Sequence, residues 1–319
     1  RRRPLGRYTG GMKMHTSPRR LDVPAGSFTP PHFGVPWLAW AVVALVLAAA
    51  PHRASAQDPA ATAPHKTLVV PGEVFSVDGH TAFLFTPAEV NALPPGAPRP
   101  WILYGPTLAP YPDEAEKWMH ERFTEAGVAV AGIDTGESYG SPTAVKATEK
   151  LHAEMVKRGY ASKPALLGRS RGGLWASAWA IAHPELTSGL GGIYPVYDWR
   201  TYPGAEGAAK AYGLATADLV EQAADLCPIE KIDVVARAGI PVCIIHGDVD
   251  AVVPIEPNSA RLKARYEALG QGDLVDLIVA EGQGHNFWEG FFHCQKLVDF
   301  LIERARAGAT ESHAAAGGK

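Results

Sequence analysis

The stretch that decides the fold lies between residues 165 and 182, and its centre reads Leu166-Leu167-Gly168-Arg169-Ser170-Arg171-Gly172-Gly173-Leu174. Apolar residues typical of a buried strand precede this centre, and a helical pattern follows it as far as Ala182. The centre matches G-x-S-x-G, in which a sharp strand-to-helix turn exposes a serine hydroxyl at the end of a sheet. Glycines relieve the crowding at such a turn. Ser170 is therefore the predicted nucleophile.

Strand-like and helical segments alternate on both sides of this turn. The expected strands are the apolar runs 74–77, 81–85, 101–104, 128–133, 165–167, 189–194, 242–245 and 274–279. The expected helices cover 113–126, 142–159, 171–182, 257–269 and 290–305. This alternation predicts an α/β fold with a mostly parallel sheet and helices on both faces, and the segment 197–237 predicts a small helical insertion. Functional residues are expected on the loops that follow the strands.

A serine hydroxyl needs a base to become a good nucleophile, and His285 is the best-placed histidine. It follows the run 274–279 on a loop that contains Gly282 and Gly284, which is tight enough to bring the imidazole to Ser170. The other candidates are a histidine at a helix end, one beside the predicted acid loop, and two inside helices that are expected to face solvent: His183, His246, His152 and His120.

The base in turn needs a carboxylate that fixes its tautomer. Asp250 follows the run 242–245 and is the predicted acid. Asp248 on the same loop and Asp198, one strand earlier, are competitors. The order serine, aspartate, histidine, each after its own strand, is the pattern that points to nucleophilic catalysis.

These segments resemble the α/β-hydrolase superfamily, and within it the prolyl-oligopeptidase-like and acyl-esterase-like catalytic domains. The resemblance covers 68–305 and implies a serine hydrolase that cleaves carboxylic esters through a Ser-His-Asp triad and an acyl-enzyme. Prolyl oligopeptidases carry a β-propeller before this domain, and the stretch 57–100 is too short for one, which favours an esterase. A peptidase of the same fold and a non-catalytic binding domain are the two alternatives.

The resemblance also implies an oxyanion hole. One donor would be the N–H of Arg171, directly after the nucleophile, and the other would come from the loop after the third strand. Pro106 has no N–H there, so Thr107 is the expected second donor, with Leu108 as the alternative. The Arg171 side chain has three open roles: an oxyanion donor, a partner for a substrate carboxylate, or a salt bridge to a nearby acid. Glucuronoyl esterases are similar in carrying an arginine directly after the serine.

Three residues on loops near the predicted site are expected to contact substrate: Trp288, Glu137 and Trp199. Aromatic rings there would stack on sugar or aryl groups. The expected substrate is a small-molecule or carbohydrate ester, with polysaccharide-linked acetyl, feruloyl or uronoyl esters as the leading examples. No zinc spacing, phosphate-binding loop or dinucleotide fingerprint is present, so no metal or cofactor is predicted.

The N-terminal part of the sequence predicts a signal peptide over 1–56. Fourteen uninterrupted apolar residues at 37–50 follow a basic stretch, and Ala54-Ser55-Ala56 supplies a small-residue cleavage site. The run is shorter than a membrane span, so no stable span is expected after cleavage. The mature chain is expected to be secreted or periplasmic, with a flexible start at 57–67, a catalytic domain at 68–305 and a flexible tail at 306–319.

Charge and cysteine content limit the remaining functions. Residues 1–56 hold eight Lys and Arg and one acid, which leaves 22 basic against 32 acidic residues in 57–319, a net charge of −10. Such an acidic body repels phosphate backbones, so no nucleic-acid partner is expected. Of the three cysteines, Cys243 is expected in the core, and a bridge between Cys227 and Cys294 stays open.

Overall fold

The computed structural model describes residues 64–87 and 96–317, with side chains to residue 315. These residues form an eight-stranded sheet in the order β1-β2-β4-β3-β5-β6-β7-β8. The strands are β1 (Gly72–Val77), β2 (His80–Phe85), β3 (Trp101–Gly105), β4 (Ala129–Ile133), β5 (Ala165–Arg169), β6 (Gly189–Ile193), β7 (Val242–Gly247) and β8 (Val275–Ala280). β2 is antiparallel to both β1 and β4, and all other pairs are parallel. The predicted mostly parallel sheet is confirmed.

The first two strands form a hairpin. Asp78 and Gly79 close it with φ angles of 51° and 82°. Two positive φ values at a two-residue turn match the right-handed twist of the flanking strands, and Asp-Gly is a favoured pair for such a turn.

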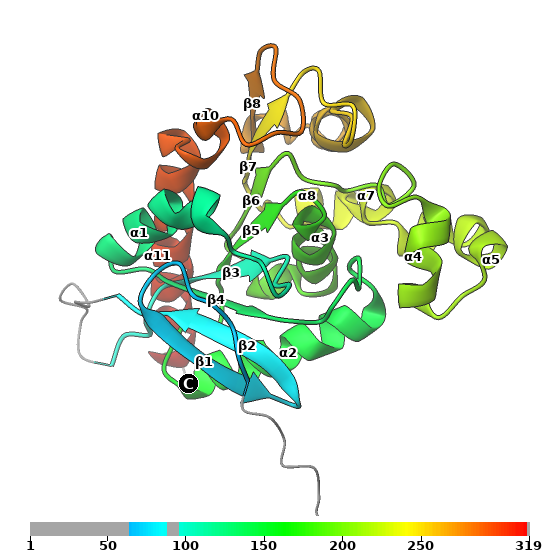
Figure 1. Ribbon diagram of the computed structural model, residues 1–319. Coiled ribbons are helices and arrows are strands. Elements are labelled where there is room, and N and C mark those ends of the chain that lie inside the picture. Colours follow the sequence, from blue (N-terminus) through cyan, green and yellow to red (C-terminus); the bar gives the residue numbers. More distant parts are fainter. Residues whose placement is uncertain (1–63, 88–95, 318–319) are drawn as a thin grey trace, which may run out of the picture. The chain divides into compact units, whose positions relative to one another are not determined.

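Helices cover both faces of the sheet (Figure 1). α1 (Lys117–Glu125) and α11 (Gln295–Gly317) pack on one face. α2 (Pro142–Lys157), α3 (Gly172–Ala182) and α8 (Asp233–Arg237) pack on the other. Outside the insertion described below, the other helical elements are η1 (Glu114–Glu116), η2 (Pro184–Leu186), η3 (Glu256–Ala260), η4 (Gly272–Leu274), α9 (Arg261–Ala268) and α10 (Glu289–Phe292). This two-faced cover explains why the central strands β3, β4, β5 and β6 are buried over their whole length.

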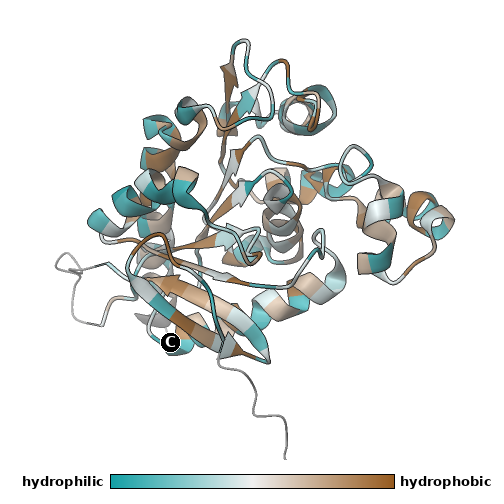
Figure 2. Cartoon of the chain, in the orientation of Figure 1, coloured by the Kyte–Doolittle hydropathy of each residue, from teal (hydrophilic) through white to brown (hydrophobic). Residues whose placement is uncertain are grey.

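Two hydrophobic clusters form the core, one on each face. Phe123 and Leu301 belong to one cluster, and Leu151 and Trp179 belong to the other, all with no more than 1% exposure. Figure 2 shows the contrast between the apolar strands and the hydrophilic stretches of helices α1 and α2. Burial of these apolar side chains is the main stabilising contribution.

The predicted insertion is helical, as expected. It comprises α4 (Ala205–Tyr212), α5 (Thr216–Glu221), α6 (Ala223–Leu226), α7 (Pro228–Lys231) and α8. α4 and α5 lie to the side of the sheet, beyond α3 (Figure 1). The first residues of the expected insertion belong to the core instead, because Tyr197 and Trp199 are fully buried.

The predicted flexible tail is wrong for the described residues. α11 continues through Gly317. Ala309 is buried, and Lys163 Nζ lies 2.7 Å from Glu311 Oε2. Gly308 and Ala309 of the expected tail thus pack on the body, whereas residues 313–315 are exposed.

The predicted signal peptide lies outside the described residues, as does most of the expected flexible start. Lys66, within that start, is 8% exposed, and its Nζ donates to the Leu108 carbonyl at 2.6 Å. Over the described parts of the chain, no helix has the length and hydropathy to cross a bilayer.

Candidate active site

The turn between β5 and α3 presents Ser170 as the sequence predicted. Ser170 has a φ of 50°, a sparsely populated conformation for a residue with a side chain. Its N–H donates to Ile193 O at 2.9 Å, and its carbonyl accepts from Val196 N at 2.8 Å. A Cβ at Gly172 would lie 2.0 Å from Gly105 O, so only glycine permits this close approach. The backbone around the turn therefore holds the serine in place.

Three side chains from three loops meet above this turn. Ser170 Oγ lies 2.8 Å from His285 Nε2, and His285 Nδ1 lies 2.7 Å from Asp250 Oδ2. The ionised carboxylate accepts the Nδ1 proton, which leaves Nε2 unprotonated and able to accept the serine hydroxyl. The structure thus joins the predicted nucleophile, base and acid in one hydrogen-bonded chain.

Asp250 is held as a carboxylate by several donors. Its Oδ1 accepts the N–H groups of Val252 at 2.9 Å and Val253 at 2.8 Å. Burial raises the pKa of Asp250, but hydrogen bonds from His246, His285 and the Val253 amide outweigh burial, so the net pKa is well below the ordinary value. Asp250 therefore stays ionised in its buried position.

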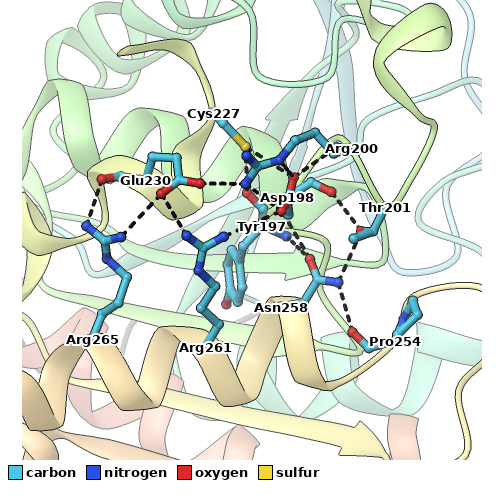
Figure 3. Close-up of polar contacts among 10 residues, drawn as sticks. All are labelled: Tyr197, Asp198, Arg200, Thr201, Cys227, Glu230, Pro254, Asn258, Arg261 and Arg265. Atoms are coloured by element: carbon cyan, nitrogen blue, oxygen red, sulfur yellow. Dashed lines mark hydrogen bonds and ion pairs between the residues drawn. The ribbon is translucent and has the colours of Figure 1, made fainter. Parts of the chain in front are cut away.

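The competing acids lie elsewhere. Asp248 Oδ1 accepts the Gly282 N–H at 2.7 Å and so ties the acid loop to the histidine loop. Asp198 accepts two charged hydrogen bonds of 2.7 Å from Arg200 and belongs to a separate network, drawn in Figure 3. In that network Glu230 also contacts Arg261, which attaches the insertion to α9. Asp198 is therefore a structural anchor.

A buried charge cluster lies beneath the nucleophile turn. The Arg169 guanidinium contacts Glu116 at 2.7 Å and Asp113 at 3.0 Å, and the Tyr104 hydroxyl donates to Glu116 at 2.9 Å. Burial raises the pKa of Glu116, and Arg169 opposes that rise. Arg169 also packs against the ring of Phe287, with 5.3 Å between its Cζ and the ring centroid. The cluster thus links the serine turn to the histidine loop.

A cavity of about 180 Å³ opens over Ser170 and His285. Its wall is made by four aromatic rings, two arginines and a few small or polar side chains: Tyr111, Tyr194, Tyr202, Phe287, Arg169, Arg171, Pro106, Val252 and Asn286. This volume suits a small acyl or alcohol group more than an extended polymer segment.

The three residues expected to contact substrate have different outcomes. The prediction for Trp199 is wrong, because its side chain is fully buried in the core. Trp288 is 43% exposed and packs edge-on against Phe291. It does not line the cavity, whereas its neighbour Phe287 does. Glu137 is not among the lining residues, but it accepts a hydrogen bond from Arg171, which is. Of the three roles left open for Arg171, the structure shows the salt bridge to a nearby acid.

The expected oxyanion donors stay predictions. Thr107 is 2% exposed, and its Oγ1 donates to Tyr104 O at 3.2 Å. Within residues 64–87 and 96–317, neither the Thr107 amide nor the Arg171 amide donates a hydrogen bond to another group. Both N–H groups thus have no acceptor within that part of the chain, and Arg171 directly precedes the first residue of α3.

Sequence reasoning missed three tyrosines in the cavity wall: Tyr111, Tyr194 and Tyr202. The Tyr194 ring lies 4.3 Å from the His285 ring, centroid to centroid, and directly follows β6. Burial is the main cause that raises the pKa of its hydroxyl to about 12. Its place after a strand was the available signal. Tyr111 and Tyr202 lie in loops whose paths the local pattern does not determine.

His120 also differs from expectation. It was expected to face solvent, but it is fully buried beside Phe85, Tyr104 and Phe123. Burial lowers its pKa to about 3. The helix α1 turns this face toward the sheet, so His120 serves as a core aromatic.

Within the described residues, the cysteines are unpaired and no metal-binding cluster is formed. All three cysteines are free thiols, and Cys243 lies in the core as predicted. Across 64–87 and 96–317, no three His, Cys, Asp or Glu side chains gather in a metal-binding arrangement.

Comparison with solved structures places this site in a known fold. A Mycobacterium tuberculosis puromycin-hydrolyzing peptidase superposes with a TM-score of 0.57 at 20% identity, over 74% of this chain and 39% of that one. Est1E from Butyrivibrio proteoclasticus gives 0.53 at 18% identity, over 73% of this chain and 98% of that one. A thermostable esterase gives 0.54 at 17% identity, over 75% and 64%. The chain thus spans 39% of the length of that peptidase.

The sequence comparison gives the family. No curated protein matches the chain. Residues 142–302, just over half of the chain, match the prolyl oligopeptidase family, and they include Ser170, Asp250 and His285. The chain therefore has the α/β-hydrolase fold and belongs to the prolyl oligopeptidase family.

Proposed function

We propose that this protein hydrolyses carboxylic esters of small molecules or carbohydrates, with Ser170 as nucleophile, His285 as base and Asp250 as the orienting acid. The observation that carries the proposal is the chain of two hydrogen bonds, 2.8 Å from Ser170 to His285 and 2.7 Å from His285 to Asp250. Both distances are within the range that direct proton transfer requires.

The reaction has two halves. Ser170 Oγ attacks the acyl carbon while its proton passes to His285 Nε2, and the carbonyl electrons move to the oxygen. The tetrahedral intermediate collapses, the bond to the alcohol oxygen breaks, and the imidazolium gives its proton to that oxygen. Water then attacks the acyl-enzyme and gives a proton to His285. Collapse releases the acid and returns the proton to Ser170.

The oxyanion would lie against two amides. The Arg171 N–H, next to the first residue of α3, and the Thr107 N–H after β3 are the proposed donors. The first turn of a helix favours negative charge, which adds to the effect of the Arg171 amide. Each aimed donor is worth about 10²–10³ in rate in serine hydrolases.

Cavity size supports an ester over an oligopeptide. Pockets for drug-sized ligands occupy roughly 300–1,000 Å³, and the cavity here is smaller, at about 180 Å³. A peptidase is the second candidate, because the family match and the puromycin-hydrolyzing neighbour favour it. The two candidates share the same three side chains, so substrate profiling separates them.

The test combines labelling and turnover. A fluorophosphonate probe should label the wild-type protein, and Ser170→Ala should abolish both labelling and turnover. Ser177→Ala, in the helix α3 that follows the nucleophile turn and bonded to the Gly173 carbonyl, is the control and should keep both. Cleavage of 4-nitrophenyl acetate without cleavage of alanyl or glycyl-prolyl 4-nitroanilide supports the esterase. The reverse preference would assign a peptidase, and a folded, unlabelled wild type would assign a binding domain.

Export is part of the same proposal. It rests on the basic start, the apolar run 37–50 and the small residues before Gln57. We expect the mature protein to begin at Gln57 after expression of the full chain in a bacterial host. N-terminal sequencing of the extracellular or periplasmic fraction tests this, and recovery of uncleaved protein in the cytoplasm contradicts it.

A further inference from the structure

We propose that the Arg171 side chain selects esters that carry a carboxylate, and that Glu137 occupies the guanidinium until such a substrate binds. This inference rests on the proposed function and names its substrate class. The positions of Arg171 and Glu137 relative to the cavity carry it.

The charges around the cavity are of one sign. Arg169 and Arg171 both line it, and no Asp or Glu side chain lines it among the residues that the structure describes. Arg169 is 5% exposed and already paired with the buried Glu116 and with Asp113. Of the two arginines, Arg171 is therefore the one that can exchange its carboxylate partner for a substrate carboxylate.

The geometry of Arg171 favours such an exchange. Its Nη1 is bonded to Glu137, and no other carboxylate contacts it within the described ranges. A guanidinium carries five N–H donors in a planar fork, so one bond leaves several of them for a ligand carboxylate. The rings of Tyr111 and Tyr202 lie 6.0 and 5.8 Å from its Cζ and limit the directions in which it can move.

Glu137 is suited to give up its partner. Its side chain is 44% exposed, against 22% for Arg171, and Glu137 is not among the residues that line the cavity. Exposed ion pairs contribute little to stability, so water can replace Arg171 around Glu137 at small cost. A substrate carboxylate inside the cavity would be less exposed than Glu137 and would gain the stronger bond.

Matched pairs of esters test the selection. The first pair is 4-acetoxybenzoate and its methyl ester, with the carboxylate on the alcohol side. The second is mono-4-nitrophenyl adipate and its methyl ester, with the carboxylate on the acyl side. Comparison of the two pairs shows on which side of the ester bond the protein accepts a carboxylate. Each kcat/KM is divided by the rate constant for hydroxide hydrolysis. We expect the anionic member of at least one pair to be preferred by about tenfold.

The ratio of kcat/KM for the anionic ester to kcat/KM for the neutral ester is also measured for three variants and one control. Arg171→Gln should lower the anionic-to-neutral ratio by about tenfold, and Arg171→Lys should lower it less because a charge remains. Glu137→Gln should raise the ratio, since the competing carboxylate is gone. Arg122→Gln, which breaks the exposed pair with Glu125, changes net charge equally and should leave the ratio unchanged.

Two results would overturn the inference. One is a wild-type ratio near one for both pairs, and the other is an Arg171→Gln variant that slows both members of a pair by the same factor. Calorimetry on Ser170→Ala separates this inference from the proposed function. Tighter binding of the anionic ester without turnover by the wild type keeps the selection and rejects the esterase. Equal binding of both esters rejects the selection.

Discussion

Asp250 Oδ2 lies 2.7 Å from His285 Nδ1, although 35 residues and the whole of α9 and β8 separate the two side chains. Parallel strands β7 and β8 are neighbours, so the loops after them begin at the same edge of the sheet. This adjacency places the carboxylate behind the imidazole. Asp198 follows β6 but is bound to Arg200 instead.

The first prediction uses this contrast between two aspartates. Asp250→Asn should lower kcat by about 10⁴, because an amide donor at this position favours the wrong tautomer of His285. Asp198→Asn should leave kcat/KM per folded molecule within about threefold of the wild type, because its contacts end in the network of Arg200 and Arg261. Steady-state kinetics with 4-nitrophenyl acetate measures both. A crippled Asp198→Asn beside an active Asp250→Asn would reverse the assignment.

The second prediction concerns pH and stability. The folded pKa of Asp250 is below its unfolded value near 3.8, so its ionisation stabilises the fold above that pH. The stabilisation is lost as the pH falls through the lower folded pKa. It amounts to about 1.4 kcal/mol for each unit by which the folded pKa lies below the unfolded pKa. Between pH 6 and pH 3, the free energy of unfolding should therefore fall less steeply in Asp250→Asn than in the wild type.

Urea unfolding at several pH values measures that slope. Asp273→Asn, which changes an exposed aspartate in η4, is the matched control and should keep the wild-type slope. Equal slopes for all three proteins would show that Asp250 contributes nothing to acid stability.

The sequence predicted the sheet, the helices and the meeting of Ser170, His285 and Asp250, because each rests on a local signal. Apolar runs mark buried strands, and glycines mark the turn at Ser170. The role of Trp199 and the helical tail were mispredicted, because packing decides both. Trp199 follows a strand, as site residues do, but the chain turns it into the core. Composition alone does not distinguish an Ala-rich tail from a docked helix.

The partners of Arg171 and Arg169 show the same limit. Sequence left the role of Arg171 open, and Glu137 lies 34 residues before it. Glu116 lies 53 residues before Arg169. Such pairs depend on tertiary structure and leave no periodic pattern.

The third prediction tests the buried cluster beneath the nucleophile. Glu116→Gln keeps the shape of the side chain but leaves Arg169 with Asp113 as its one remaining carboxylate partner in the described chain. We expect the free energy of unfolding to fall by about 3 kcal/mol, since a buried charge then lacks its main partner. Glu125→Gln breaks an exposed pair and should change it by less than about 0.5 kcal/mol. Chemical denaturation of the two variants measures both losses in the free energy of unfolding. Equal losses would show that the buried cluster contributes no more than an exposed ion pair.

The last prediction concerns the C-terminal turns of α11. An ideal Cβ on Gly308 would lie 2.0 Å from Lys163 O and 2.9 Å from Ser188 Cβ. Helix propensity alone favours alanine there by about 1 kcal/mol, but overpacking costs roughly 1–3 kcal/mol. We expect Gly308→Ala to lower the Tm, while Thr310→Ala on the exposed side leaves it nearly unchanged. Deletion of 307–319 should also lower the Tm, because Ala309 and the Lys163–Glu311 pair are lost. A deletion variant with the wild-type Tm would mean that these turns do not pack on the body.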